Sequence, residues 1–297
     1  MNQLSCLRSG PVLFLGIAIL FAIPFELKGD DSKDHNYRAK YLDLLKNQQY
    51  DELFTLLGQW EKAEPTNPEL YIAYFNYHFN RGRRSVQTIG QAPNGQYLLY
   101  TKREYDPEHA KAALACIDKG LSLAPNRLDI HFGKVRLLAE LGDIKAQRDA
   151  IVAVLTQSTQ NGNRWMWTSG VPLTEGEASM FAGIEEYLGE WFERFTETGS
   201  YLKEVAELET SLYPKNPWGW NILAGYYREV GDFPNALACL LKAEVLDPQD
   251  GVVVANIGQC YVMLKEHEKA IEYFRKLETH PVLQLRQYAA EWIQKLK

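Results

Sequence analysis

The stretch WNILAGYYREVGDFPNALACLLKAEVLDP, residues 220–248, decides the fold that this sequence predicts. Large residues at Trp220, Leu223 and Tyr227 are spaced so that they share one face of a helix. A Gly-Asp pair at 231–232 then ends this helix and caps a second one, which stops at an Asp-Pro pair. A single amphipathic hairpin of this kind cannot bury its apolar face alone, so the stretch predicts neighbours of the same type.

The pattern returns 34 residues further along the chain. The matching pairs are Leu223 and Ile257, Ala224 and Gly258, Tyr227 and Tyr261, Ala236 and Ala270, Leu240 and Phe274, and Pro214 and Pro248. This period and the order W-x2-L-[G/A]-x2-Y, then A-x3-[F/L], then Pro, resemble the tetratricopeptide repeat, a helix-turn-helix unit of about 34 residues. The resemblance extends over roughly residues 217–284 and implies a right-handed helical solenoid.

Weaker copies of the hairpin fill the rest of the chain. Asn-Pro or Asp-Pro pairs at 67–68, 106–107 and 216–217 mark helix starts, because Asn and Asp cap helices and Pro is favoured at the first helical position. The last segment, 282–297, has one apolar stripe opposite a polar one, as a terminal capping helix requires. We therefore predict an all-α, right-handed solenoid of about six helix pairs plus a C-terminal capping helix, with two non-helical inserts.

The predicted organisation has three parts. They are a signal peptide or N-terminal anchor at 1–29, degenerate helical repeats at 34–213 with inserts at 81–106 and 159–175, and two near-consensus repeats with the capping helix at 214–297.

The N-terminal part contains the uncharged run PVLFLGIAILFAIPF at 11–25, which is shorter than the roughly 20 residues of a spanning helix. We expect an export signal and a mature chain that begins near Asp30. The small-x-small cleavage pattern is weak, so an uncleaved membrane tether stays open. The expected location is exported, and periplasmic or envelope-associated in a bacterium.

Composition and motifs exclude several classes of function. The chain has 297 residues and a formal charge of −6, with dispersed Lys and Arg, so it lacks the basic surface that nucleic-acid binding needs. No phosphate-binding loop, GxGxxG, GxSxG or HExxH motif occurs, the six histidines stand apart, and the cysteines form no CxxC. We predict no catalytic residue, no cofactor and no metal. A hydrolase whose dispersed carboxylates converge in a deep pocket remains the alternative.

The resemblance implies a concave groove lined by the first helix of each repeat, which binds a protein or peptide without catalysis. Transferred to this sequence, the candidate groove residues are Trp218, Asn221, Ile222, Arg228, Glu229, Asn256, Gln259 and Met263. We expect these residues to be free of core contacts. Members that clamp a peptide carboxylate use Lys where this chain has Asn221 and Ala255, so that ligand is not implied here.

The two inserts offer candidate sites of their own. In the first, an Asn-Gly pair at 94–95 between apolar residues predicts a short β-hairpin. At its base, Arg81, Arg83 and Arg84 could hold a phosphate or carboxylate; the alternative is a solvated loop with scattered charge.

The second insert places Trp165 and Trp167 among turn residues. Exposed tryptophans would stack on a sugar ring or a partner surface, which gives the alternative function of an envelope-assembly factor that binds glycan or peptidoglycan. The other interpretation, which we favour, is that the pair fills a gap where two repeats meet imperfectly.

Overall fold

The computed structural model of the protein describes residues 33–91 and 95–297. This part of the chain divides into two compact units, an N-terminal unit at 33–180 and a C-terminal unit at 181–297, with the division inside one helix. The predicted leader at 1–29 and the expected processing site near Asp30 lie outside the described residues.

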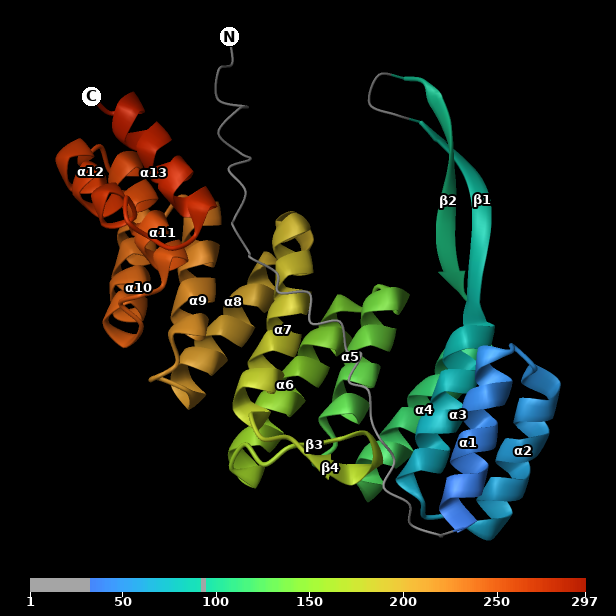
Figure 1. Cartoon of the computed structure of the whole chain (residues 1–297). Helices are drawn as coiled ribbons and strands as arrows, with labels where there is room; N and C mark the ends of the chain where they lie inside the picture. The colour runs from blue at the N-terminus through green and yellow to red at the C-terminus, as the bar shows by residue number, and fades with distance from the viewer. Residues whose placement is uncertain (1–32, 92–94) are drawn as a thin grey trace. The chain divides into compact units, whose positions relative to one another are not determined.

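The N-terminal unit consists of helical hairpins with two small two-stranded sheets (Figure 1). Its elements are α1 (Lys33–Lys46), α2 (Tyr50–Ala63), α3 (Pro68–Gly82), β1 (Arg83–Gln91), β2 (Tyr97–Tyr105), α4 (Pro107–Leu123), α5 (Leu128–Leu141), α6 (Ile144–Asn161), β3 (Met166–Trp167), the 3-10 helix η1 (Thr168–Gly170), β4 (Val171–Pro172) and the beginning of α7 (Gly176–Glu193).

The predicted helix starts are confirmed in this unit. Asn67 caps α3 by accepting a hydrogen bond from the backbone N–H of Glu69 over 2.9 Å. Asp106 caps α4 in the same way and accepts from the N–H groups of Glu108 and His109 over 3.0 and 3.2 Å. Each cap is followed by a proline, which has no N–H to leave unsatisfied.

The first insert is a β-hairpin, as predicted, but its strands are longer than the sequence suggested. β1 and β2 have nine residues each and pair antiparallel from Arg83 opposite Tyr105 to Gln91 opposite Tyr97. The hairpin leaves α3 and returns to α4, and it extends away from both helices (Figure 1). Among the described residues these two strands pair with each other alone, and α3 packs against α4 beside them.

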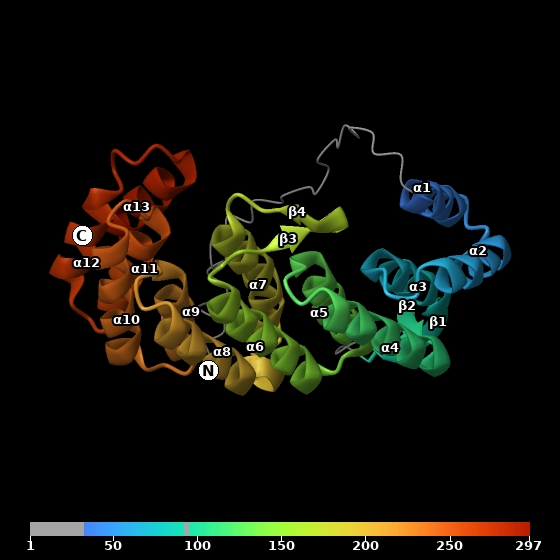
Figure 2. The ribbon, with the colours of Figure 1, turned by 90° about the horizontal axis from the view of Figure 1, so that it is seen from below.

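The C-terminal unit contains the rest of α7 and the near-consensus repeats (Figure 2). Its further elements are α8 (Phe195–Leu212), α9 (Pro217–Glu229), α10 (Phe233–Leu246), α11 (Gly251–Met263), α12 (His267–Lys276) and α13 (Leu283–Lys295). The residues matched at an offset of 34 confirm the repeat, because Ala236, Leu240, Ala270 and Phe274 are all 0% exposed.

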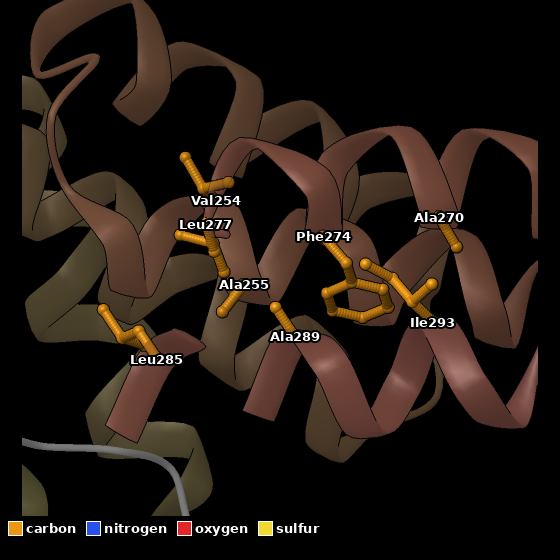
Figure 3. Packing of buried hydrophobic residues seen from close by; sticks show 8 residues of the cluster. All are labelled: Val254, Ala255, Ala270, Phe274, Leu277, Leu285, Ala289 and Ile293. Atoms are coloured by element: carbon orange, nitrogen blue, oxygen red, sulfur yellow. The ribbon is translucent and has the colours of Figure 1, made fainter. Parts of the chain in front are cut away.

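The terminal helix covers the last repeat, as predicted. Leu285, Ala289 and Ile293 of α13 are buried in one cluster with Phe274 and Leu277 (Figure 3). α13 thus supplies the outer neighbour that the last hairpin of a helical stack needs in order to bury its apolar face. With α1 to α12 paired in sequence, the described residues form six helix pairs and a capping helix, the predicted all-α arrangement.

Candidate functional site

A series of polar side chains joins the first helices of the last two repeats. Arg228 of α9 donates from Nη1 to Asn256 Oδ1 over 2.7 Å, and from Nη2 to Gln259 Oε1. Asn256 donates to Asn221 Oδ1 over 3.5 Å, the long limit of a hydrogen bond, and Gln259 donates to the hydroxyl group of Tyr288 on α13. We call these five residues the polar chain. It runs across the first helices of successive repeats and the capping helix.

The structure brings half of the predicted groove residues into the polar chain. The remaining predicted groove residues are Trp218, Ile222, Glu229 and Met263. Glu229 and Met263 are exposed at the ends of their helices, Trp218 is half-buried, and Ile222, at 4% exposure, belongs mainly to the core. The expectation that groove residues have no packing role is therefore wrong for Ile222. It is also wrong for Arg228, whose hydrogen bonds tie α9 to α11.

Beside Asn221 the surface is hollowed between α7, α8 and α9. Apolar side chains of Phe181, Leu188, Trp218 and Ile222 wall this hollow, and three polar residues also line it, Glu185, Glu209 and Asn221. The hollow offers room for one group of about the size of a water molecule. It lies against the polar chain, because Asn221 belongs to both.

The two acids of the hollow titrate abnormally. Glu209 on α8 is 2% exposed, and burial, followed by the negative charge of Glu185, raises the pKa of its carboxyl group to about 8. Burial and then Asp250, the N-cap of α11, also raise the pKa of Glu185. Both shifts have the same physical cause, since a carboxylate that loses water and faces other negative groups is more stable protonated. At neutral pH, Glu209 therefore holds a proton.

The second insert does not form an aromatic surface. Trp165 is 1% exposed and donates from Nε1 to Ser158 Oγ over 2.9 Å, while the ring of His131 meets it edge-on at 5.3 Å between centroids. Trp167, the other tryptophan of this insert, is half-buried. The exposed-stacking interpretation is therefore wrong for Trp165, and the space-filling interpretation fits its burial.

The three arginines of the first insert do not gather around one point. Arg81 lies over the ring of the tyrosine that begins α2, at 5.3 Å from its centroid. Arg83 forms an ion pair with Glu140 over 2.9 Å, and Arg84 forms one with Asp106 over 2.6 Å. The groups that these two arginines hold are thus carboxylates of the chain itself.

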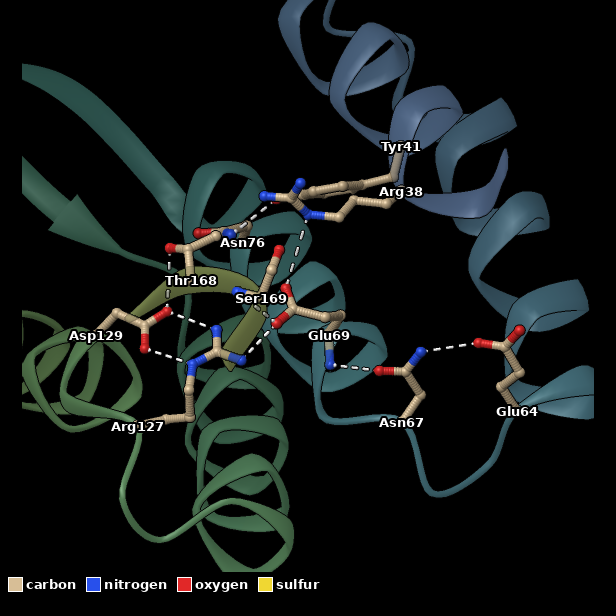
Figure 4. A network of polar contacts seen from close by, with 10 residues as sticks. All are labelled: Arg38, Tyr41, Glu64, Asn67, Glu69, Asn76, Arg127, Asp129, Thr168 and Ser169. Carbon is tan, nitrogen blue, oxygen red and sulfur yellow. Dashed lines mark hydrogen bonds and ion pairs between the residues drawn. The ribbon is translucent and has the colours of Figure 1, made fainter. Parts of the chain in front are cut away.

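A buried arginine that the sequence gave no reason to single out organises the N-terminal unit. Arg127 is 3% exposed, and it forms ion pairs with Glu69 over 2.5 Å and with Asp129 over 2.7 Å (Figure 4). Both acids also accept from the second insert, Glu69 from the N–H of Ser169 and Asp129 from the hydroxyl group of Thr168. We call these residues the Arg127 cluster. Its charges are paired and hydrogen-bonded, which is what makes their burial tolerable.

The structure corrects one sequence-based statement on histidines. His78 of α3 and His109 of α4 are not apart, since their Nδ1 atoms lie 3.0 Å from each other. Within residues 33–91 and 95–297, however, no three His, Cys, Asp or Glu side chains gather as metal ligands would. The cysteines at 116, 239 and 260 are free thiols. Among the helices of these same residues, none is both long and apolar enough to cross a bilayer.

Comparison with protein families gives one match. The model of the tetratricopeptide repeat matches residues 253–279, which include nearly all of α11 and all of α12. The C-terminal unit thus contains a tetratricopeptide repeat. The residue pairs at an offset of 34 extend the same pattern to α9 and α10, where Leu223, Ala236 and Leu240 are buried as Ile257, Ala270 and Phe274 are.

Several solved structures are partly similar to this chain, each with a TM-score below 0.5. PilW, a type IV pilus biogenesis factor, is 12% identical with a TM-score of 0.39, and the match covers 88% of this chain and all of that one. YrrB, a tetratricopeptide-repeat protein with an unusual peptide-binding site, is 16% identical with a TM-score of 0.41, over 79% and 97% of the two chains. The structure of Naa15/Naa10 bound to HypK-THB is 12% identical with a TM-score of 0.43, and the match covers 89% of this chain and 35% of that one. These likenesses are too distant to indicate a function, and the search of curated proteins finds no match.

Proposed function

We propose that the C-terminal unit binds an extended segment of a partner protein along the polar chain, and that the protein acts as a non-enzymatic scaffold. Repeat stacks present continuous surfaces that serve this purpose. The supporting observation is the polar chain itself, which aligns one guanidinium group and three side-chain amides across α9 and α11.

The chemistry of these groups suits a peptide backbone. An extended peptide offers one N–H and one C=O group per residue, and a side-chain amide can donate to the C=O group and accept from the N–H group. Arg228 and its amide partners hold one another in place, so little side-chain freedom is lost when a peptide binds. An arrangement of this kind favours recognition of backbone over recognition of one particular terminal group.

Selection of peptides from a random library on the full chain tests this function. We expect the selected peptides to bind at least about tenfold more weakly to the protein variant that combines Arg228→Ala with Asn256→Ala than to the wild type. The matched control combines Arg275→Ala with Gln249→Ala, which removes one exposed arginine and one exposed amide of the same unit outside the polar chain. If no peptide is enriched, or if both double variants bind equally well, the proposed function is wrong.

We also propose that the protein is exported and stays at the cell envelope, either free or tethered through residues 11–25. This proposal is supported by the apolar composition of that run in the sequence. The intact mass of the protein from its native cells decides between the two forms. A chain that begins near Asp30 indicates cleavage, an unprocessed chain recovered with membranes indicates a tether, and an unprocessed chain in the soluble cell fraction contradicts export.

A further inference from the structure

The hollow between α7, α8 and α9 contains the buried carboxyl group of Glu209. Glu209 is 2% exposed, and among the described residues no hydrogen bond or ion pair reaches its carboxyl group. Buried polar groups are normally hydrogen-bonded, because their loss of water otherwise costs free energy. The side chain lines a hollow that opens to the surface, so a group that enters from outside can supply the missing partner.

The groups that act on this site define the charge of such a partner. Glu185 on α7 faces Glu209 on α8, and Asp250 at the start of α11 acts on Glu185. The neighbours on α9 are Trp218 and Asn221, which carry no charge. An anion would add to the repulsion in this site, whereas a cation would relieve it, and the face of an indole ring such as that of Trp218 also attracts cations.

The size of the hollow further limits which cationic group can bind there. It has room for one water-sized group, which fits an ammonium group and excludes the larger planar guanidinium group of arginine. The same limit argues against hydrolysis. Two catalytic carboxyl groups must flank a scissile bond and its substrate atoms, at a separation of at least about 5 Å in glycosidases. The hollow, with room for one water-sized group, is not the deep pocket that such a hydrolase needs.

We propose that the hollow formed by Glu185, Glu209 and Trp218 receives the ε-ammonium group of a lysine side chain from the bound partner segment. This inference rests on the proposed function, because Asn221 places the hollow beside the polar chain. A segment that lies on the polar chain brings its side chains within reach of the hollow. The lysine ammonium group gives Glu209 the charged hydrogen-bond partner that it lacks among the described residues.

Binding by this route releases a proton. Glu209 is protonated at neutral pH in the free protein, and an ammonium group between the two acids stabilises the ionised form of its carboxyl group. Lysine keeps its charge throughout this range, since its ordinary pKa is about 10.4. Affinity therefore rises with pH between about 6 and 8, by at most about tenfold per pH unit for one released proton.

The test uses peptides selected on the full chain. We expect one lysine at a constant position in these peptides, and we expect that its acetylation weakens binding to the wild-type protein at least about tenfold. The double variant that combines Glu185→Gln with Glu209→Gln should bind the acetylated and unmodified peptides equally, and the pH dependence of its affinity should disappear. Gln has the shape of a protonated Glu, so the fold is preserved, as circular dichroism would verify. Glu186→Gln on the exposed face of α7 is the matched control, and it should keep the discrimination.

The outcomes separate this inference from the proposed function. Peptides that depend on Arg228 and Asn256 but bind equally well with lysine or acetyl-lysine overturn the lysine site and leave the groove intact. If the double Gln variant still binds the unmodified peptide more tightly than the acetylated one, the lysine site is also overturned, because the lysine then binds elsewhere. If no peptide is enriched at all, the groove and the lysine site both fail.

Discussion

Substitution of Gly258 by Ala tests the packing of the near-consensus repeats. A Cβ atom at Gly258 would lie 2.6, 2.8 and 2.9 Å from three ring atoms of Phe274, well inside van der Waals contact. That ring is 0% exposed and is stacked on Trp292 of α13, with 5.9 Å between centroids and 13° between planes. Because the ring cannot retreat, the added methyl group must push α11 away from α12 or α12 against α13.

Two effects of opposite sign set the change in unfolding free energy that Gly258→Ala causes. Overpacking of a filled core costs about 1–3 kcal/mol. Replacing Gly by Ala inside a helix recovers about 0.5–1 kcal/mol, because the unfolded chain loses conformational freedom. Gly189→Ala in α7 isolates the second effect, since a Cβ atom there meets nothing within 4 Å. The difference in unfolding free energy between the two variants is thus the cost of the contact, about 1–3 kcal/mol.

The measurement combines urea unfolding of the full chain, followed by circular dichroism, with hydrogen exchange. A stack of repeats need not unfold in one step, so exchange locates the loss of stability. Gly258→Ala should speed exchange in α11, α12 and α13, whereas Gly189→Ala should leave exchange in those helices unchanged. Equal stability of the two variants would show that Phe274 is not confined as described.

Three further predictions concern the repeat register, the capping helix and the buried acid. Ala236→Leu, at a position that is 0% exposed, should lower the unfolding free energy by about 1–3 kcal/mol. Ser211→Leu on the exposed face should change it by no more than about 0.5 kcal/mol. Equal denaturation midpoints for the two variants would refute the repeat register. Deletion of 282–297 uncovers the face of Phe274 and should cause aggregation or a lower Tm in thermal unfolding, and a soluble truncation of unchanged Tm would deny α13 a capping role. Glu209 binds its proton more tightly in the folded than in the unfolded state, so its contribution to stability declines as pH rises from about 4.5 to about 8. Tm values at pH 5 and pH 8 should show a smaller decline in Glu209→Gln than in the wild type, and an unchanged decline would contradict the raised pKa.

The helical framework was predictable because its signals are local. Cap residues such as Asn67 and Asp106 act within three residues of their position, and the spacing of Ala236 and Leu240 reflects one helix face. The same applies to the hairpin of the first insert, which needs only a turn between two strands. Four residues of the polar chain were also predictable, because the repeat fixes which side of the first helix they occupy.

The hollow was not predictable because its two acids come from different helices of a degenerate repeat. Glu185 and Glu209 are ordinary residues for a helix surface, and no spacing links them. The packing of α8 against α9 contributes to the burial of Glu209, whose Cβ atom lies 2.9 Å from the position that a Cβ atom of Gly219 would take. Trp165 illustrates the same limit. Turn residues surround it in the sequence, but its burial depends on α6, whose Ser158 accepts its hydrogen bond.

The Arg127 cluster leads us to expect a particular order of assembly in the N-terminal unit. Hairpins of a helical stack close short loops, and a stack held only by such contacts can open from its end one hairpin at a time. Glu69 and Ser169, by contrast, are 100 residues apart, and Arg127 stands 58 residues from Glu69. Because these contacts close longer loops than those within a hairpin, we expect the second insert to dock after α3 and α5 have formed. Once docked, it links α3 to α5 from outside the stack, so these two helices cannot separate without releasing it.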